Sequence, residues 1–463
     1  STQTYDYFNY SFIPSITQTS SINNWNGQAT RGYDKDDQKT LEWLGNYFLD
    51  ANDHSLRLMA GYSYQYFQSS GMSAENRNFP SDVLSYNNLG TGLWMTEDGR
   101  LGYGSYKNDS RLIAFLGRAS YSYKDKYMLT ASLRYEGSSK FGINHKWGYF
   151  PGASVGWRLS AEPFMENASW VNDLKLRADV GVTGNQNFDN YISLTTYSGF
   201  GYYPFEGTWY QVFGPARNPN PDLRWEKGIN ANIGLDFSIL DSRVGGSLNF
   251  YRREQQDLLG NYLAPTPPFA HPNVFVNVGT MRNIGFEVEV SANVIRHAGF
   301  DYTIDLAAST NDNKFVSFSN SEFQGQSFVE MASLPAPGSP GPIQRLEEGQ
   351  RIGSFYMYKH AGIDDQGRWL IYDKDDNVIL STEKTIEDRR YVGNGLPKYF
   401  LSLSNRFRYG NWDMSVFLRG VFGFDVFNVH DFYYGIPSVP KGQNVLRSAY
   451  GKNAGITMEK EPT

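Results

Sequence analysis

The feature that most constrains the fold of this chain is an alternation of apolar and polar residues with a period of two. The stretch from 127 to 135 shows it most clearly, because its odd positions are Tyr127, Leu129, Ala131, Leu133 and Tyr135. The even positions from 130 onward are Thr, Ser and Arg. Successive side chains of a strand point to opposite faces, so the pattern predicts a strand with one apolar and one polar face. Similar stretches recur at 113–123, 153–159, 174–183, 229–239, 284–294, 300–308, 399–409 and 412–418.

The residue types on the polar faces distinguish a membrane barrel from a soluble sheet. These faces carry mostly Ser, Asn and Gly with a few Arg, whereas the solvent face of a soluble sandwich is rich in Lys and Glu. Each stretch has about the length that crosses a bilayer at a tilt, and no apolar run is long enough for a transmembrane helix. We therefore predict an all-β fold, a transmembrane antiparallel β-barrel with a wet lumen.

Short and long connections alternate along the chain. Short turns are predicted at 50–53, 124–126, 241–242, 296–299 and 410–411, with one longer linker at 161–173. Long segments lie between them, at 69–110, 138–149, 185–228, 257–283 and 311–398. Bacterial outer-membrane barrels have short periplasmic turns and long extracellular loops. We therefore expect Asp125 on the periplasmic side and Asn218 on the extracellular side, within reach of reagents added to whole cells.

Composition excludes several classes of function. Lys and Arg number 42 against 48 Asp and Glu, and a net charge of −6 lacks the basic footprint of a nucleic-acid binder. The absence of Cys, with six His that show no ligand spacing, predicts neither a metal site nor a cofactor. The run from Gly152 to Gly156 matches G-x-S-x-G, but a nucleophile elbow needs a strand-to-helix turn and Ser154 is expected in mid-strand. No catalytic residue is predicted, and the chain is not expected to be an enzyme.

The number of predicted strands indicates that the barrel continues beyond this chain. About 13 strands are expected, whereas single-chain bacterial barrels close with an even number. An open sheet edge in lipid would leave backbone groups without partners. The last residues, 460–463, form a polar tail rather than a strand. We therefore expect residues 1–463 to be an incomplete barrel region, the middle of a longer chain.

A series of long motifs covers nearly the whole sequence. They are 127–142 (YMLTASLRYEGSSKFG), 146–165 (KWGYFPGASVGWRLSAEPFM), 170–186 (WVNDLKLRADVGVTGNQ), 218–234 (NPNPDLRWEKGINANIG), 277–289 (NVGTMRNIGFEVE), 353–364 (GSFYMYKHAGID) and 392–400 (VGNGLPKYF). In this order they resemble the SusC/RagA family of TonB-dependent outer-membrane transporters of the Bacteroidetes. Several motifs in order are more specific than any single one.

The resemblance implies a barrel of about 22 strands, of which this chain would supply roughly strands seven to nineteen. It further implies an amino-terminal plug, a carboxypeptidase-like extension and a TonB box, none of which is recognised in residues 1–463, nor are the last strands. TonB would act through that plug region. The implied surroundings are the lipid of the bacterial outer membrane and a SusD-like surface lipoprotein that forms a lid. The implied cargo is an oligosaccharide or a peptide.

Charged residues on the polar faces are predicted to line the lumen: Arg118, Arg134, Arg158, Arg177, Glu287 and Glu289. We expect the arginines to pair with Asp179, Glu136, Glu287 and Glu289 and to hold the plug by hydrogen bonds. Contact with an anionic cargo is the alternative. Charges that face a wet lumen are common, which favours the first interpretation.

An aromatic cluster lies in the long segment 185–228. Its members are Tyr202, Tyr203, Trp209 and Tyr210, together with Phe205 and Phe213. Aromatic rings present rigid apolar faces that stack on sugar rings at low entropic cost, so these residues are candidates for substrate binding. Packing against a lid protein or another loop is the alternative, and we favour it.

One segment has the spacing of a calcium loop. Asp373, Asp375 and Asn377 occupy positions 1, 3 and 5, but Val378 stands at the sixth position and Lys384 at the twelfth. A calcium loop needs Gly and Glu there. A solvated hairpin tip is therefore the preferred reading.

The function favoured by the resemblance is active import of a large nutrient through a plugged barrel beneath a lipoprotein lid. A passive porin is the main alternative, and it would have neither plug nor lid. A soluble carbohydrate-binding β protein is a third possibility, and an outer-membrane enzyme is a fourth that no catalytic constellation supports.

Overall fold

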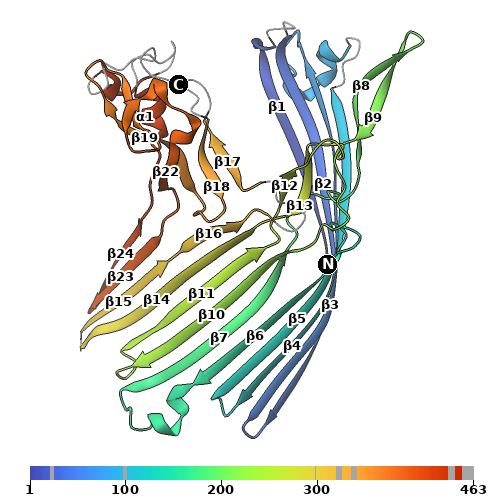
Figure 1. Cartoon of the computed structure of the whole chain (residues 1–463). Helices are drawn as coiled ribbons and strands as arrows, with labels where there is room; N and C mark the ends of the chain where they lie inside the picture. Colours follow the sequence, from blue (N-terminus) through green and yellow to red (C-terminus); the bar gives the residue numbers. More distant parts are fainter. Residues whose placement is uncertain are drawn as a thin grey trace.

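The computed structural model describes residues 1–20, 25–96, 102–297, 299–319, 326–334, 341–435 and 444–450. Its main feature is one long, curved antiparallel sheet, with smaller sheets gathered at one end (Figure 1). The polar tail at 460–463 lies outside the described residues, as does Ala298 in a predicted turn. Within the described part of the chain, no helix has the length and apolarity to cross a membrane.

The main sheet follows the order of the chain, and we call it the wall. Every pairing along it is antiparallel. Its path is β1 (Thr2–Ser20), β2 (Trp25–Ala51), β3 (His54–Arg77), β4 (Tyr103–Tyr123), β5 (Tyr127–Ser138), β6 (Trp147–Arg158), β7 (Val171–Asn185), β10 (Glu226–Ile239), β11 (Val244–Gln256), β14 (Thr280–His297), β15 (Phe300–Thr310), β23 (Tyr399–Tyr409) and β24 (Trp412–Phe422), while β16 (Asp312–Ser317) pairs with β14. No pairing joins β1 to β24 among the described residues. The predicted all-β, antiparallel architecture is confirmed.

The two faces of the wall differ in chemistry as the alternation predicts. One row across neighbouring strands is formed by Leu129, Val155, Ala178, Ile233 and Phe250, each directly opposite the next. The large members of this row are exposed, although burial of apolar side chains is the main driving force of folding. We call this side of the wall the apolar face and the other the polar face. A continuous apolar surface of this kind is suited to lipid rather than to water.

The wall has a turn end and a loop end, named for the connections that each carries. At the turn end, β4 and β5 are joined by residues 124–126, β10 and β11 by 240–243, and β23 and β24 by 410–411. Lys124 and Asp125 adopt φ of 55° and 52°, the left-handed conformation that tight hairpins require. These short turns are confirmed. Aromatic rings border the apolar face at both ends, with Tyr123 and Tyr127 at the turn end, and Tyr135 stacked on Tyr149 nearer the loop end.

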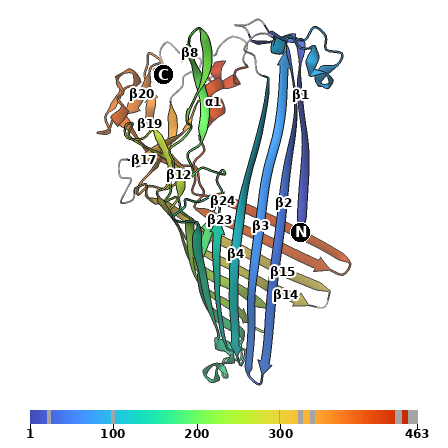
Figure 2. The same cartoon turned by 90° about the vertical axis from the view of Figure 1, so that its right-hand side faces the viewer.

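The long connection predicted at 69–110 is partly wrong. Strands β3 and β4 continue into it and stay paired as far as Ala74 opposite Tyr103, so only 78–102 connects them. Figure 2 shows β2, β3 and β4 rising far beyond the shorter strands. Beyond the membrane both faces of a strand meet water, so the apolar alternation stops while backbone pairing persists. The alternation of apolar and polar residues therefore ends before the strand does, and the sequence predicts strands that are too short.

Smaller elements fill the loop end (Figure 1). They are η1 (Ser85–Asn87), η2 (Leu89–Thr91), η3 (Trp94–Thr96), β8 (Tyr197–Phe205), β9 (Thr208–Pro215), β12 (Leu259–Leu263), β13 (Asn273–Asn277), β17 (Phe328–Ser333), β18 (Pro342–Glu347), β19 (Ser354–Ile363), β20 (Trp369–Tyr372), β21 (Val378–Leu380), η6 (Ser381–Glu383), η7 (Ile386–Asp388), β22 (Arg389–Asn394), α1 (Val429–Tyr434) and η8 (Arg447–Tyr450). We call the sheet of β17 to β22 the loop-end module. A core of Leu112, Phe141, Phe150, Leu223 and Trp225 supports the loops where they leave the wall.

One turn-end connection is longer than the others, and we call residues 159–170 the linker. It is folded into η4 (Leu159–Ala161) and η5 (Pro163–Met165) and hangs below β6 and β7 (Figure 1). Its carboxylate Glu162 accepts hydrogen bonds from the Tyr127 hydroxyl at 2.6 Å and from Trp157 Nε1 at 2.9 Å. Lys126 Nζ lies 3.6 Å from the same carboxylate. The ends of β5 and β6 thus hold the linker in place.

The attachment of the linker should depend on pH. The hydrogen bonds from Tyr127 and Trp157 lower the pKa of Glu162. Because the pKa of Glu162 is lower in the folded protein, its ionised carboxylate stabilises the attached linker. This stabilisation is complete above the unfolded-state pKa of about 4.3 and is lost as pH falls through the folded-state pKa. We expect a spin label at Glu166→Cys to be immobile at pH 7 and to gain mobility in acid below about pH 4. In Glu162→Ala, which removes the acceptor of both hydrogen bonds, the label should be mobile at both pH values, and an unchanged pH response there would contradict this account.

Candidate functional site

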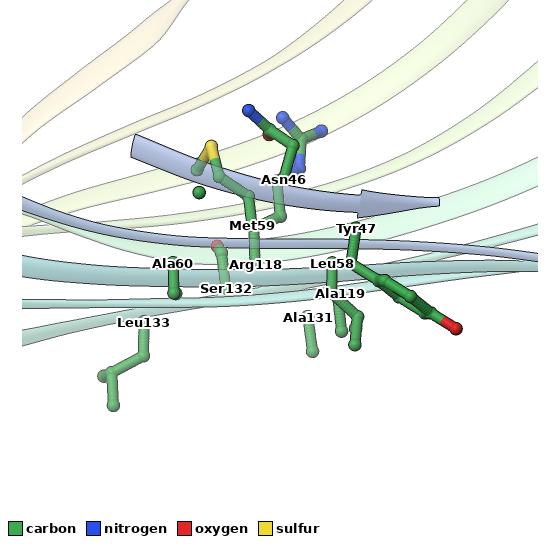
Figure 3. Close-up of a pocket in the computed structure, with 12 residues that line it drawn as sticks. Asn46, Tyr47, Leu58, Met59, Ala60, Arg118, Ala119, Ala131, Ser132 and Leu133 are labelled. Carbon is green, nitrogen blue, oxygen red and sulfur yellow. The ribbon is translucent and has the colours of Figure 1, made fainter. Parts of the chain in front are cut away.

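The predicted lumen residues all lie on the polar face of the wall. Figure 3 shows the alternation at β2 to β5, where Arg118, Asn46 and Met59 project from one side and Leu58 and Leu133 from the other. The pocket drawn there has a volume of about 590 Å³ and is lined mainly by residues of the apolar face, among them Tyr47, Leu58 and Leu133. Register places the remaining residues on the same face as Arg118: Arg134, Arg158, Arg177, Glu287 and Glu289.

Three of the predicted arginines form ion pairs on this face. Arg134 binds Glu136 in a bidentate manner, with Nε to Oε2 at 2.6 Å and Nη2 to Oε1 at 2.8 Å, as expected. Arg158 Nε lies 3.3 Å from Asp173, which was not among the expected partners. Arg177 pairs with Asp236 at 3.1 Å.

The partner of Arg177 was predicted wrongly, for a reason that lies in a neighbouring glycine. Gly234 stands directly opposite Arg177, and a Cβ at Gly234 would lie 2.6 Å from the guanidinium carbon. The missing side chain lets the guanidinium cross to Asp236 and to the Asn249 side chain. Asp179 instead accepts a hydrogen bond from Asn232 at 3.1 Å.

Other predicted charges on the polar face have no partner within the wall. The side chains of Arg118, Glu287 and Glu289 form no ion pair or hydrogen bond with any described residue, although their backbones are paired in the wall. The expectation that Glu287 and Glu289 pair with the predicted arginines is therefore wrong. Their charges remain available to whatever fills the space in front of the polar face.

Sequence reasoning missed a group of amides next to these charges. A hollow of about 470 Å³ is lined by Arg177, Asn230, Asn232, Asn249, Tyr251 and Glu287, among others. Amides both donate and accept hydrogen bonds, which suits them to polar cargo or to a protein backbone. The signal was present in the sequence, because Asn230 and Asn232 share the polar parity of their strand.

A row of alternating charge crosses the polar face near the turn end. Arg296, Asp301, Arg408 and Asp413 lie on β14, β15, β23 and β24, each directly opposite the next. They line a polar hollow of about 840 Å³ together with Arg406, which pairs with Asp305 at 2.6 Å. Opposite charges that face each other across strands stabilise this register.

The loop aromatics lie on a freestanding hairpin made of β8 and β9 (Figure 1). Tyr202, Tyr203, Trp209 and Tyr210 are all exposed, Trp209 to 67%. The pairing of Tyr203 with Tyr210 puts these two on one face of the hairpin, whereas Tyr202 and Trp209 occupy the other. The four residues therefore do not form a single platform. No other described loop covers them.

The base of this hairpin is fixed by asparagine side chains. Asn218 donates from Nδ2 to the carbonyl oxygens of His271 and Asn273, at 2.7 Å and 2.8 Å, and accepts from the His271 backbone N–H. Asn220 donates to the Phe275 carbonyl at 2.9 Å. Asn218 is only 4% exposed, so the expectation that reagents reach it from outside is wrong. A polar loop residue is expected to be exposed, but the Asn218 side-chain amide instead forms hydrogen bonds with the backbone of a neighbouring loop.

The candidate cation segment is a hydrogen-bonded turn. The Asp373 carboxylate accepts from the backbone N–H groups of Asp375 and Asn377 and from the Asn377 side chain. These bonds, chiefly the one from the Asn377 side chain, lower the pKa of Asp373. No group of three or more His, Cys, Asp or Glu residues in the described chain could hold a metal ion. Ser154 lies in mid-strand opposite Thr130 and Asp179, not at a strand-to-helix turn.

Comparisons with known proteins match this architecture. The family model described as TonB dependent receptor-like, beta-barrel matches residues 1–451. TonB-dependent receptor P3 of Formosa agariphila is 30% identical over 425 residues, which are 87% of this chain and 40% of that protein. TonB-dependent receptor SusC of Bacteroides thetaiotaomicron is 28% identical over 322 residues, covering 68% of this chain and 31% of that one.

A solved structure shows the same fold. The RagAB peptide importer in its closed-closed state superposes with a TM-score of 0.79 at 20% sequence identity, over 94% of this chain and 46% of that one. The chain thus spans less than half the length of the relatives that it matches.

Proposed function

The chain belongs to the TonB-dependent receptor family as part of its β-barrel, and from this premise we propose that it forms the wall of an active importer in the bacterial outer membrane. Its cargo is a large nutrient, an oligosaccharide or a peptide. The observation that carries the proposal is a wall with an apolar face on one side and a charged, amide-rich face on the other. A soluble carbohydrate-binding protein would have no use for the apolar face.

We further propose that the charges without partners face a plug and the moving cargo. Arg118, Glu287 and Glu289 remain unpaired within the described chain, and unpaired charge is tolerated where water or a polar partner replaces the missing contact. Pulling of such a plug by TonB would couple transport to the energised inner membrane. A SusD-like surface lipoprotein is the proposed lid over the loop end.

Uptake measurements in the source bacterium test active import against passive diffusion. Deletion of the gene should abolish growth on the oligosaccharide or peptide that the protein imports, and a plasmid copy should restore it. Collapse of the proton-motive force should stop uptake by an active importer, whereas diffusion through a porin would continue. Uptake that survives this collapse would overturn the proposal in favour of the porin. Recovery of the protein in buffer without detergent would instead support a soluble carbohydrate-binding protein.

The hairpin aromatics are proposed to contact either cargo or lid. Because the pairs lie on opposite faces, Tyr203→Ala with Tyr210→Ala and Tyr202→Ala with Trp209→Ala can be examined separately. Loss of cargo affinity with an intact lid complex assigns a face to cargo, and the reverse assigns it to the lid. If neither double variant changes cargo binding or lid association, the hairpin has no role in either.

Labelling of whole cells tests which end of the wall faces outward. Thr208 lies at the exposed start of β9, and Asp125 lies in the turn between β4 and β5. We expect Thr208→Cys to react with an impermeant thiol reagent on intact cells and Asp125→Cys to react only after the outer membrane is opened. The chain contains no Cys of its own to compete. Labelling of Asp125→Cys alone would invert the topology.

A further inference from the structure

The linker 159–170 carries large apolar side chains that the chain does not cover. Phe164 is 65% exposed and Trp170 is 57% exposed, although the segment around them is folded and hydrogen-bonded. Leu240, in the next turn, is also exposed, and its backbone N–H donates to the Trp170 carbonyl at 2.7 Å. The other described turns at this end are short and polar, as at 124–126 and 410–411.

The Phe164 side chain continues the apolar face of the wall. The Phe164 and Trp157 rings pack edge to face, with their centroids 6.4 Å apart. Trp157 lies directly between Tyr127 and Leu176 in a row of the apolar face. The linker therefore extends the aromatic border of that face past the ends of the strands.

We propose that the linker is a membrane anchor that inserts Phe164 and Trp170 into the boundary between headgroups and acyl chains of the leaflet at the turn end. Amphipathic aromatic side chains are enriched at this depth of a bilayer. The hydrogen bonds of Glu162 to Tyr127 and Trp157 fix the height of the linker against the wall. The occupant is a phospholipid surface, because the exposed Phe164 ring is continuous with a face that already requires lipid.

The charges around the linker favour an apolar mode of insertion. Lys126 lies against Glu162 at 3.6 Å, and Arg158 against Asp173 at 3.3 Å. Cations that are paired in this way add little attraction for anionic headgroups. Insertion should therefore be insensitive to salt and to the content of anionic lipid, unlike that of a basic amphipathic segment.

Depth-dependent quenching in vesicles tests the anchor. The intact protein, with an environment-sensitive fluorophore on Phe164→Cys or on Trp170→Cys, is placed in phosphatidylethanolamine and phosphatidylcholine vesicles with and without phosphatidylglycerol. We expect blue-shifted emission that lipid carrying bromine on its acyl chains quenches strongly and aqueous iodide quenches weakly. The two labelling positions guard against an effect of removing either ring.

Matched controls come from the same end of the wall. Labels on Glu166→Cys, on the same linker, and on Asp125→Cys, in a short turn, should show the opposite preference, with strong iodide quenching. Heat-modifiable migration in gels confirms that each variant is folded. Strong iodide quenching at both Phe164→Cys and Trp170→Cys in folded protein would overturn the anchor and leave these rings as a surface for a periplasmic protein. A response to phosphatidylglycerol or salt would overturn the apolar mode of insertion.

Discussion

Ala131→Arg is expected to lower the free energy of unfolding in lipid vesicles by about 2–4 kcal/mol. Ala131 lies on the apolar face of β5, midway between the bordering rings of Tyr127 and Tyr135. A guanidinium at this depth meets hydrocarbon on a face where the chain offers it no polar partner. The penalty falls towards the interfaces, so the middle of the strand should be the most sensitive position.

The neighbouring residue provides the control for this substitution. Thr130 lies on the polar face, directly opposite Ser120 and Ser154. Thr130→Arg should therefore cost less than about 1 kcal/mol, since its charge enters a polar space. A urea titration of each variant in vesicles measures both values. Equal losses at Ala131 and Thr130 would refute the assignment of the two faces.

Arg389→Ala should destabilise the loop-end module by about 3 kcal/mol. The Arg389 side chain is only 6% exposed. It donates to Glu330 at 2.9 Å and to the carbonyl oxygens of Tyr356 and Pro342, and so it connects β17, β18, β19 and β22. Arg345 shares Glu330 with it at 3.0 Å and stacks between Phe328 and Tyr356. Removing one cation leaves buried acceptors without donors.

Arg368 in the same module serves as the comparison. It pairs with Asp364 at 2.7 Å, but its side chain is well exposed, and exposed pairs contribute about 0–1 kcal/mol. Hydrogen exchange followed over 328–394 should show faster opening in Arg389→Ala and little change in Arg368→Ala. Indistinguishable exchange in the two variants would show that the buried cluster does not hold the module together.

The alternation was sufficient to predict the membrane-spanning wall but not its full height. Leu129 and Val155 face lipid, and every second residue of a membrane-spanning strand must be apolar for this reason. Above the membrane, β3 and β4 stay paired with water on both faces, and no such requirement applies to Ala74 or Tyr103. The hairpin of β8 and β9 was missed for a related reason, because aromatic residues occupy both of its faces.

The alternation predicted on which face of the wall the candidate residues lie, but it did not predict which residues form ion pairs with one another. Parity alone placed Arg118, Arg177 and Glu287 together on the polar face. The choice of Asp236 by Arg177 depends on register across two strands and on the absence of a side chain at Gly234, which spacing along the sequence does not encode. Likewise, the burial of Asn218 follows from a loop more than fifty residues away in sequence.

The junction of β15 with β23 has a consequence for how this architecture can diversify. Thr310 pairs with Tyr399, and Asn311 N–H donates to the Lys398 carbonyl at 3.0 Å, so the segment that contains the loop-end module leaves and re-enters the sheet between these two strands, with only β16 paired to β14 on the way. The entropy of closing a loop grows only with the logarithm of its length. Such a segment can vary in length and sequence between relatives while the strands of the wall keep their register. The surface that recognises cargo or a partner can then change without any change in the wall.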